Sequence, residues 1–210
     1  MMLTTSYFLA GASGKRDFWQ PVMQRLKSSN LIMHQIDYPS FAGCPAHSNV
    51  NSFTDLSDYV FNQIQRPSVI IAQSMGGLFA IRAALEKPNV QALVLVATSG
   101  GIDLTPFNIQ DWREAYLNTY LDVPHWFTET DINYQDQLKN IHIPVLLIWA
   151  NDDAISPLTV GQALQRYLPH AELKVITAKD HHFAFTQPRI IAKWIEEFLL
   201  KHAVISDLDK

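Results

Sequence analysis

Short apolar runs alternate along this chain with longer stretches in which apolar residues recur every three or four positions. The short runs predict β-strands at Ser6–Leu9, Ile32–Asp37, Ser68–Ala72, Ala92–Ala97, Val145–Ala150 and Glu172–Ile176. The longer stretches predict helices at Asp17–Ser28, Phe53–Ile64, Met75–Glu86, Pro157–Tyr167 and Pro188–Lys201. Strands that alternate with helices in this way favour an α/β fold built around a parallel sheet.

The interval from Gly100 to Ile143 breaks this alternation, because it is far longer than a usual connection between a strand and the next element. The interval is rich in aromatic residues, which disordered segments lack, and these include Trp112, Tyr116, Tyr120, Trp126, Phe127 and Tyr134. We therefore expect a single domain over residues 1–210, with residues 100–143 forming a small helical cap inserted within it.

Composition and charge narrow the class of protein. The chain has 210 residues, of which 48% are hydrophobic and 17% charged, and such a chain can bury one continuous core. Sixteen Lys and Arg against twenty Asp and Glu give a net charge of −4 without any basic run, so we expect no nucleic-acid partner. The apolar run near the N-terminus is too short to span a bilayer and no basic segment precedes it, so we expect no membrane span. The single cysteine, Cys44, excludes an internal disulfide and favours a cytoplasmic location.

The segment VIIAQSMGGLFAIRAAL places Ser74 between a predicted strand and a predicted helix. A serine on such a sharp turn can expose its hydroxyl, provided that the residues two before and two after it are small, as Ala72 and Gly76 are. The first turn of the helix then points its amides toward that hydroxyl, so that the Met75 N–H can stabilise a developing oxyanion. A serine at this position can also simply cap the helix, and the motif alone leaves both interpretations open.

This segment resembles the G-x-S-x-G nucleophile motif of the α/β-hydrolase family, with Ala72 in place of the first glycine, and the resemblance covers nearly the whole chain. It implies an α/β-hydrolase fold with a reduced, six-stranded, all-parallel sheet in the order 2-1-3-4-5-6, flanked by helices and covered by the short cap. It places the serine turn after the third strand. Ligands are then expected at the carboxyl ends of the strands.

In this family the catalytic acid follows the serine, in the loop after a later strand. PVLLIWANDDAISP is similar to the family pattern G-x-x-D-x-x-x-P, with Ala150 in the glycine position. The resemblance selects Asp153, three residues after Ala150 and four before Pro157, and leaves Asp152 as the alternative.

The family's histidine comes last, and DHHFAFTQP follows the last predicted strand. His181 lies seven residues before Pro188, the interval that the family tends to keep, while the adjacent His182 is the alternative. An imidazole can activate a serine hydroxyl when a carboxylate holds the other ring nitrogen, which is why these three residue types have to meet. The remaining histidines have no spacing typical of a zinc site, so we expect neither a metal nor another cofactor.

YFLAGASGKRDFWQPV resembles the family stretch H-G-x-x-G-S-x-x-x-W, with Ala10 in place of the histidine and Gly11 retained. The resemblance implies that the backbone N–H of Ala12 forms the oxyanion hole together with that of Met75. Because the contribution is a backbone amide, the side chain at this position can vary.

The sequence thus predicts a carboxylesterase-like serine hydrolase that cleaves a small-molecule carboxylic ester, or a thioester, through an acyl-serine intermediate. Aromatic residues of the cap, namely Trp112, Tyr116 and Trp126, are predicted to line a pocket for an apolar acyl group. Hydrolysis or lysis of a carbon–carbon bond on the same three residues is an alternative, as is a ligand-binding member of the fold without activity. The natural substrate and the oligomeric state stay open.

Overall fold

The computed structural model describes residues 3–28, 30–107, 109, 111, 113–121, 123–124, 126, 128 and 132–205. Its centre is a six-stranded parallel sheet in the order β2-β1-β3-β4-β5-β6, which confirms the predicted fold class and strand order. The strands are β1 (Thr4–Leu9), β2 (Leu31–Ile36), β3 (Ser68–Gln73), β4 (Val90–Val96), β5 (Val145–Ala150) and β6 (Ala171–Ile176). The α-helices are α1 (Gln20–Met23), α2 (Phe53–Gln63), α3 (Gly76–Glu86), α4 (Arg113–Thr119), α5 (Leu158–Tyr167), α6 (Phe183–Thr186) and α7 (Pro188–Lys201).

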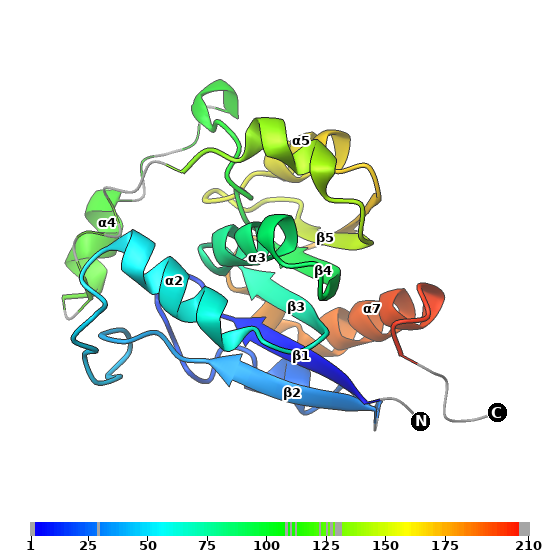
Figure 1. The fold of residues 1–210 in the computed structure, drawn as a ribbon. Coiled ribbons are helices and arrows are strands. Elements are labelled where there is room, and N and C mark those ends of the chain that lie inside the picture. The colour runs from blue at the N-terminus through cyan, green and yellow to red at the C-terminus, as the bar shows by residue number, and fades with distance from the viewer. Residues whose placement is uncertain are drawn as a thin grey trace.

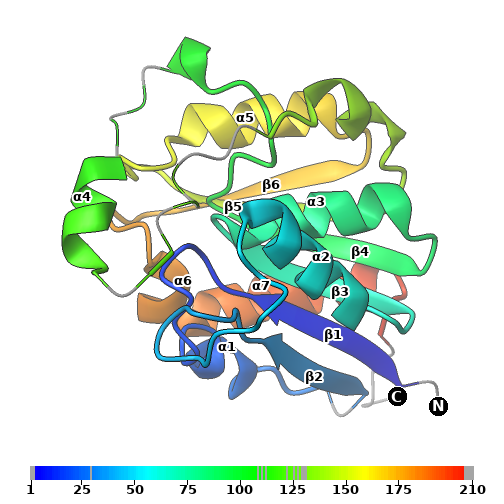
Figure 2. The ribbon, with the colours of Figure 1, turned by 60° about the vertical axis from the view of Figure 1, so that its left-hand side comes forward.

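Helices cover both faces of the sheet (Figures 1 and 2). Helices α2 and α3 pack together on one face, α1 and α7 pack together on the other, and α5 contacts β5 and β6. The inner strands β1, β3 and β5 are therefore buried along their whole length, which explains the apolar sequence of β5 and of the middle of β3. The two edge strands, β2 and β6, are more exposed.

Helix starts follow from local sequence. The Ser52 hydroxyl accepts a hydrogen bond of 3.1 Å from the Asp55 amide, and the Asp55 carboxylate accepts one of 3.0 Å from the Asn51 amide, so the first turn of α2 is capped. Pro188 begins α7, where the amide that proline lacks would have no partner in the helix.

The predicted helix Asp17–Ser28 is much shorter in the structure, where only Gln20–Met23 is α-helical. The flanking residues form tight turns instead, in which, for example, the Arg25 amide donates to the Val22 carbonyl three residues back. The apolar periodicity nevertheless reports burial correctly, because the side chains of Phe18, Trp19, Val22 and Leu26 are all buried.

The long connection between β4 and β5 contains α4 and the short 3₁₀ segments η1 (Thr105–Phe107) and η3 (Gln135–Asn140). Helix α4 lies beyond the carboxyl ends of the strands, apart from the helices that cover the sheet (Figures 1 and 2). Within α4, every residue of which the structure describes, Tyr116 alone is buried.

No helix in the described part of the chain has both the length and the apolar character needed to cross a bilayer.

The start of α3 lies unusually close to the end of β1. A Cβ atom at Gly76 would lie 2.7 Å from the carbonyl oxygen of Ala10 and 2.8 Å from that of Leu9. Both contacts are with backbone, so neither can be relieved by a side-chain movement, and only glycine fits there.

We expect Gly76→Ala to lower the free energy of unfolding by about 1–3 kcal/mol, because the added methyl group pushes α3 away from β1. Urea denaturation followed by circular dichroism measures this change. A variant as stable as the wild type would contradict the close approach of helix and strand.

Candidate active site

The loops after β1, β3, β4, β5 and β6 meet at the carboxyl ends of the strands, around a cavity of about 590 Å³. The parallel pairing of β1 with β3 sets Leu9 opposite Ala72, so the loop after β1 runs beside the turn that carries Ser74. The other three loops follow β4, β5 and β6, which lie side by side in the sheet. Residues far apart in the sequence thereby face one cavity, at the edge of the sheet where ligands bind in this kind of fold.

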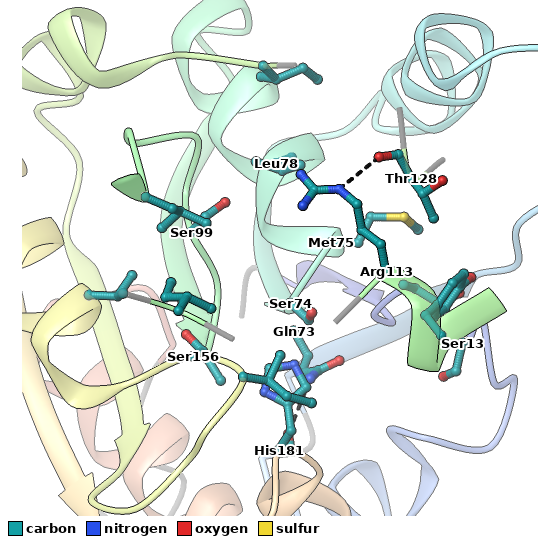
Figure 3. A pocket seen from close by; sticks show the side chains of 18 of the residues that line it. Ser13, Gln73, Ser74, Met75, Leu78, Ser99, Arg113, Thr128, Ser156 and His181 are labelled. Carbon is teal, nitrogen blue, oxygen red and sulfur yellow. Dashed lines mark hydrogen bonds between the residues drawn. The ribbon is translucent and has the colours of Figure 1, made fainter. Parts of the chain in front are cut away.

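Ser74 occupies the turn between β3 and α3 in a left-handed conformation, with φ of +51°. Such a conformation costs a non-glycine residue roughly 1–2 kcal/mol and has to be held by its surroundings. The Ser74 amide donates to the carbonyl of Val96 at 2.9 Å, and the Ser74 carbonyl accepts from the Gly77 amide at 3.0 Å. These bonds keep Ser74 at the wall of the cavity (Figure 3).

Asp153 is buried, with an exposed fraction of 3%. Hydrogen bonds to both of its oxygen atoms fix the carboxylate. One oxygen, Oδ1, accepts from the amides of Ile155 and Ser156 at 2.9 and 3.1 Å. The other, Oδ2, lies 2.7 Å from His181 Nδ1. Asp152 instead faces solvent and forms a 3.8 Å ion pair with Lys179. The structure thus brings Asp153, and not Asp152, to the histidine.

The two ring nitrogens of His181 have different surroundings, and Nδ1 contacts the Asp153 carboxylate. The Nε2 atom is buried and has no hydrogen-bond partner among the described residues, Ser74 included. In the tautomer that donates from Nδ1 to the carboxylate, Nε2 carries a free lone pair. Ser74 and His181 line the same cavity, as Figure 3 shows. The arrangement places an imidazole and a serine hydroxyl on the wall of one cavity.

The neighbouring His182 has a different environment. Its ring lies 6.1 Å from that of Phe18, edge to face, while Asp153 bonds to His181. Burial, followed by the nearby His181 and Lys15, lowers the pKa of His182. Of the two histidines that the sequence left open, the structure joins His181 to the acid.

The two amides predicted to form an oxyanion hole belong to residues that line the cavity, Ala12 and Met75. Neither amide donates a hydrogen bond within the described residues, so both are available to a ligand. Met75 stands at the N-cap of α3, where the positive end of the helix dipole adds to the effect of its amide.

The three predicted pocket residues have different positions. Tyr116 lines the cavity, and its hydroxyl donates a 2.6 Å hydrogen bond to the carbonyl of Ala12. Trp126 is not among the described residues that line the cavity, because its indole packs edge-on against Phe41, with ring centroids 6.0 Å apart. Trp112 lies outside the described residues.

The cavity wall is partly apolar and partly polar. Its apolar part includes Leu78, Ile102, Leu104, Ile109, Ile132 and Val160, and its polar part includes Ser99, Asp103, Thr105, Arg113, Thr128 and Asn133. The Arg113 guanidinium donates to the Thr128 carbonyl at 3.1 Å (Figure 3) and pairs with Asp111 at 3.2 Å. The prediction was based on the aromatic residues of the interval 100–143, and it did not include this polar part of the wall.

Two further residues join the loops, and the sequence analysis did not identify either. The side-chain amide of Gln73 donates to the backbone carbonyl of His181 at 3.3 Å. The side-chain oxygen Oδ1 of Asn151 accepts from the backbone amide of Ala178 at 3.1 Å. Gln73 occupies the variable position before the serine, so the motif carries no signal for it. Asn151 directly follows β5, and a short polar side chain at that point was the available indication.

No group of three His, Cys, Asp or Glu side chains lies together in the described part of the chain in a way that could hold a metal ion.

Comparisons with known proteins identify the family. Residues 7–132 match the model of the alpha/beta hydrolase family, and residues 109–206 match that of the TAP-like protein family. Since the first match spans more than half of the chain, the protein belongs to the α/β-hydrolase family.

Similar proteins carry several activities. The putative 2-succinyl-6-hydroxy-2,4-cyclohexadiene-1-carboxylate synthase of Bacillus subtilis is 24% identical over 91% of this chain and 88% of its own. The pimeloyl-[acyl-carrier protein] methyl ester esterase of Vibrio atlanticus is 22% identical over 78% of this chain and 81% of its own. Among solved structures, MGS-M2, an alpha/beta hydrolase enzyme from a deep-sea metagenome of the Medee basin, has a TM-score of 0.79. It is 18% identical, and the match covers 99% of this chain and 92% of that one.

The adjacent aspartates allow a matched test of the site. We expect Asp153→Asn to slow labelling by a fluorophosphonate, a reagent for activated serines, by at least about 100-fold, because the amide no longer stabilises the imidazolium that forms. Asp152→Asn, the same change one residue away at the surface, should leave the labelling rate unchanged. Equal rates in both variants would exclude Asp153 from the reaction.

Proposed function

We propose that this protein is a serine hydrolase that cleaves a carboxylic ester, or a thioester, through an acyl-serine intermediate. One observation carries the proposal. A buried Asp153 carboxylate holds His181 at 2.7 Å, and the opposite ring nitrogen is buried and without a partner among the described residues, in a cavity that Ser74 also lines. Leaving a buried nitrogen without a hydrogen-bond partner costs free energy of folding. Such an atom therefore calls for an explanation, and a ligand or a reaction that uses it provides one.

In the first half of the proposed reaction, Ser74 Oγ attacks the carbonyl carbon of the ester while His181 Nε2 takes the hydroxyl proton. The Asp153 carboxylate stabilises the resulting imidazolium. The carbonyl oxygen becomes an oxyanion, which accepts hydrogen bonds from the amides of Ala12 and Met75. The tetrahedral intermediate then breaks its bond to the leaving oxygen or sulfur, which receives the proton from His181.

In the second half, water attacks the carbonyl carbon of the acyl-serine, and His181 Nε2 takes a proton from that water. A second oxyanion forms in the same hole. Its collapse breaks the bond to Ser74 Oγ, which recovers a proton from His181, and the carboxylic acid leaves. The enzyme returns to its starting state without a cofactor.

The substrate of the proposed reaction is a small ester whose acyl group has apolar character. Leu78, Ile102 and Val160 form an apolar part of the cavity wall against which a short acyl chain can pack. The esterase among the similar proteins supports ester cleavage, without determining the alcohol or the acyl length. In this proposal residues 100–143 are the cap, and α4 supplies part of the cover over the reacting groups.

A second candidate is carbon–carbon bond chemistry on the same three residues. This candidate is supported by the similarity of 91% of this chain to the putative synthase of Bacillus subtilis. The two candidates differ in a simple way, since an esterase turns over p-nitrophenyl esters repeatedly. An enzyme that labels with fluorophosphonate but does not turn over any such ester supports the second candidate.

We expect Ser74→Ala to abolish fluorophosphonate labelling and to lower kcat for p-nitrophenyl butyrate by about 10⁴-fold or more, because the nucleophile is lost. Ser48→Ala, at an exposed serine outside the cavity, should keep both activities. Circular dichroism spectra identical to the wild type would show that both variants are folded. Labelling that persists in Ser74→Ala would refute the proposed nucleophile, and a folded wild type without labelling would indicate a binding protein.

Leu78 allows a test of the acyl site, because it lies on α3 at the cavity wall (Figure 3). We expect Leu78→Trp to reduce kcat/KM for p-nitrophenyl octanoate about tenfold more than for the acetate, since the larger ring fills space that a longer chain needs. Leu85→Trp, two turns further along the same helix and outside the cavity lining, should leave this ratio unchanged. A ratio equal in both variants would place the acyl chain elsewhere.

A further inference from the structure

Four consecutive carbonyls, from the last residue of β1 into the loop that follows it, are each held by a different donor. Trp19 Nε1 donates to the Leu9 carbonyl at 2.9 Å, and the Tyr38 hydroxyl donates to the Ala10 carbonyl at 2.7 Å. The next two carbonyls along the chain are those of Gly11 and Ala12. They accept from the Gly14 amide at 2.9 Å and from the Tyr116 hydroxyl at 2.6 Å.

These bonds fix the direction of the Ala12 amide. A peptide unit is planar, so a held carbonyl also fixes the N–H of the following residue. The bond between Gly14 and the Gly11 carbonyl holds the unit that contains the Ala12 N–H. Tyr38 holds the unit before it and Tyr116 the unit after it, so the Ala12 amide cannot turn away while both hydroxyls stay bound.

The donors on the two sides of this amide come from different parts of the molecule. Trp19 and Tyr38 are fully enclosed in the main core, with exposed fractions of 0% and 1%. Tyr116 belongs to α4, in the long connection between β4 and β5, and is the one buried residue of that helix. The buried side chain of α4 therefore bonds to the loop after β1.

We propose that Tyr116 is a positioning residue, which holds the oxyanion-hole amide of Ala12 in place only while α4 is docked over the cavity. The inference rests on the proposed function, because it gives the Ala12 amide a catalytic purpose. When α4 is docked, the Tyr116 hydroxyl closes the set of bonds around Ala12. When α4 moves away, the Ala12 carbonyl loses this partner, so the peptide unit after Ala12 is released and the Ala12 amide is held from one side only.

This role differs from that of an ordinary wall residue in what it changes. A residue that only lines the cavity affects how strongly the substrate binds, and hence KM. A residue that positions the oxyanion hole acts on a charge that exists in the transition state, and hence lowers kcat when it is lost. Replacing Tyr116 by phenylalanine keeps the ring at the wall and removes only the hydroxyl.

The experiment compares Tyr116→Phe with Tyr59→Phe, in which the hydroxyl of a tyrosine on α2, away from the cavity, is removed. We expect Tyr116→Phe to lower kcat for p-nitrophenyl butyrate about three- to tenfold, with KM within about twofold of the wild type. Inhibition by a trifluoromethyl ketone, whose adduct with the serine places an oxyanion in the hole, should weaken by the same factor. Tyr59→Phe should change none of these values.

A second measurement does not depend on activity. Hydrogen exchange of the Gly14 amide, measured by NMR, should be faster in Tyr116→Phe than in the wild type or in Tyr59→Phe, because the loop is less firmly held. Unchanged exchange would overturn the clamp itself. Faster exchange with unchanged kcat and inhibition would overturn its catalytic role. A wild type that neither labels nor turns over esters would count against the proposed function, and with it the catalytic role, while the exchange rates would still decide whether Tyr116 holds the loop.

Discussion

The geometry of the site depends on one backbone constraint, the left-handed turn at Ser74 between β3 and α3. A turn this sharp brings the start of α3 against the end of β1, where the carbonyls of Leu9 and Ala10 leave no room for a side chain at Gly76. The same contact places the loop after β1 beside the serine. The proposed nucleophile and the loop of the proposed oxyanion hole are therefore set by a single packing arrangement, and neither can move far without the other.

The second requirement is electrostatic. Asp153 is a buried carboxylate, and burial of an ionised group is unfavourable unless hydrogen bonds compensate it. Two backbone amides and the His181 ring provide that compensation. Gln73 and Asn151 then link the neighbouring loops to one another, so that the loops after β3, β5 and β6 are joined by hydrogen bonds. The carboxylate, the ring and the serine turn thus form one connected unit at the edge of the sheet.

Much of the fold was predictable, because buried parallel strands leave a strong signal in the sequence. The apolar runs at β3 and β5 identified those strands to within a residue, and the strand order followed from the family resemblance. Prediction was weakest where turns replace a helix, as around α1, since apolar periodicity reports burial and not the hydrogen-bond pattern. The ends of β1 and β4 also differed, because strand ends depend on pairing with neighbours.

The residues of the candidate site divide in the same way. Motif spacing selected Ser74, Asp153 and His181, and left Asp152 and His182 as alternatives. The structure then showed which of the adjacent aspartates is bonded to which of the adjacent histidines. The hydrogen bond between Tyr116 and Ala12 could not be foreseen, since it joins residues 104 positions apart and no motif contains both. Trp126 was placed at the cavity because it is aromatic, but Phe41 provides it with a partner elsewhere.

The position of α4 has a consequence for how such a protein can change over time. The proposed reacting groups lie on loops anchored by the sheet, while α4 is a short helix in the long connection between β4 and β5, with most of its residues exposed. Substitutions on the remaining faces of that helix can alter which molecules enter without disturbing the machinery beneath. Substrate range and chemical step can therefore evolve at different speeds, provided that the tyrosine at the contact is kept.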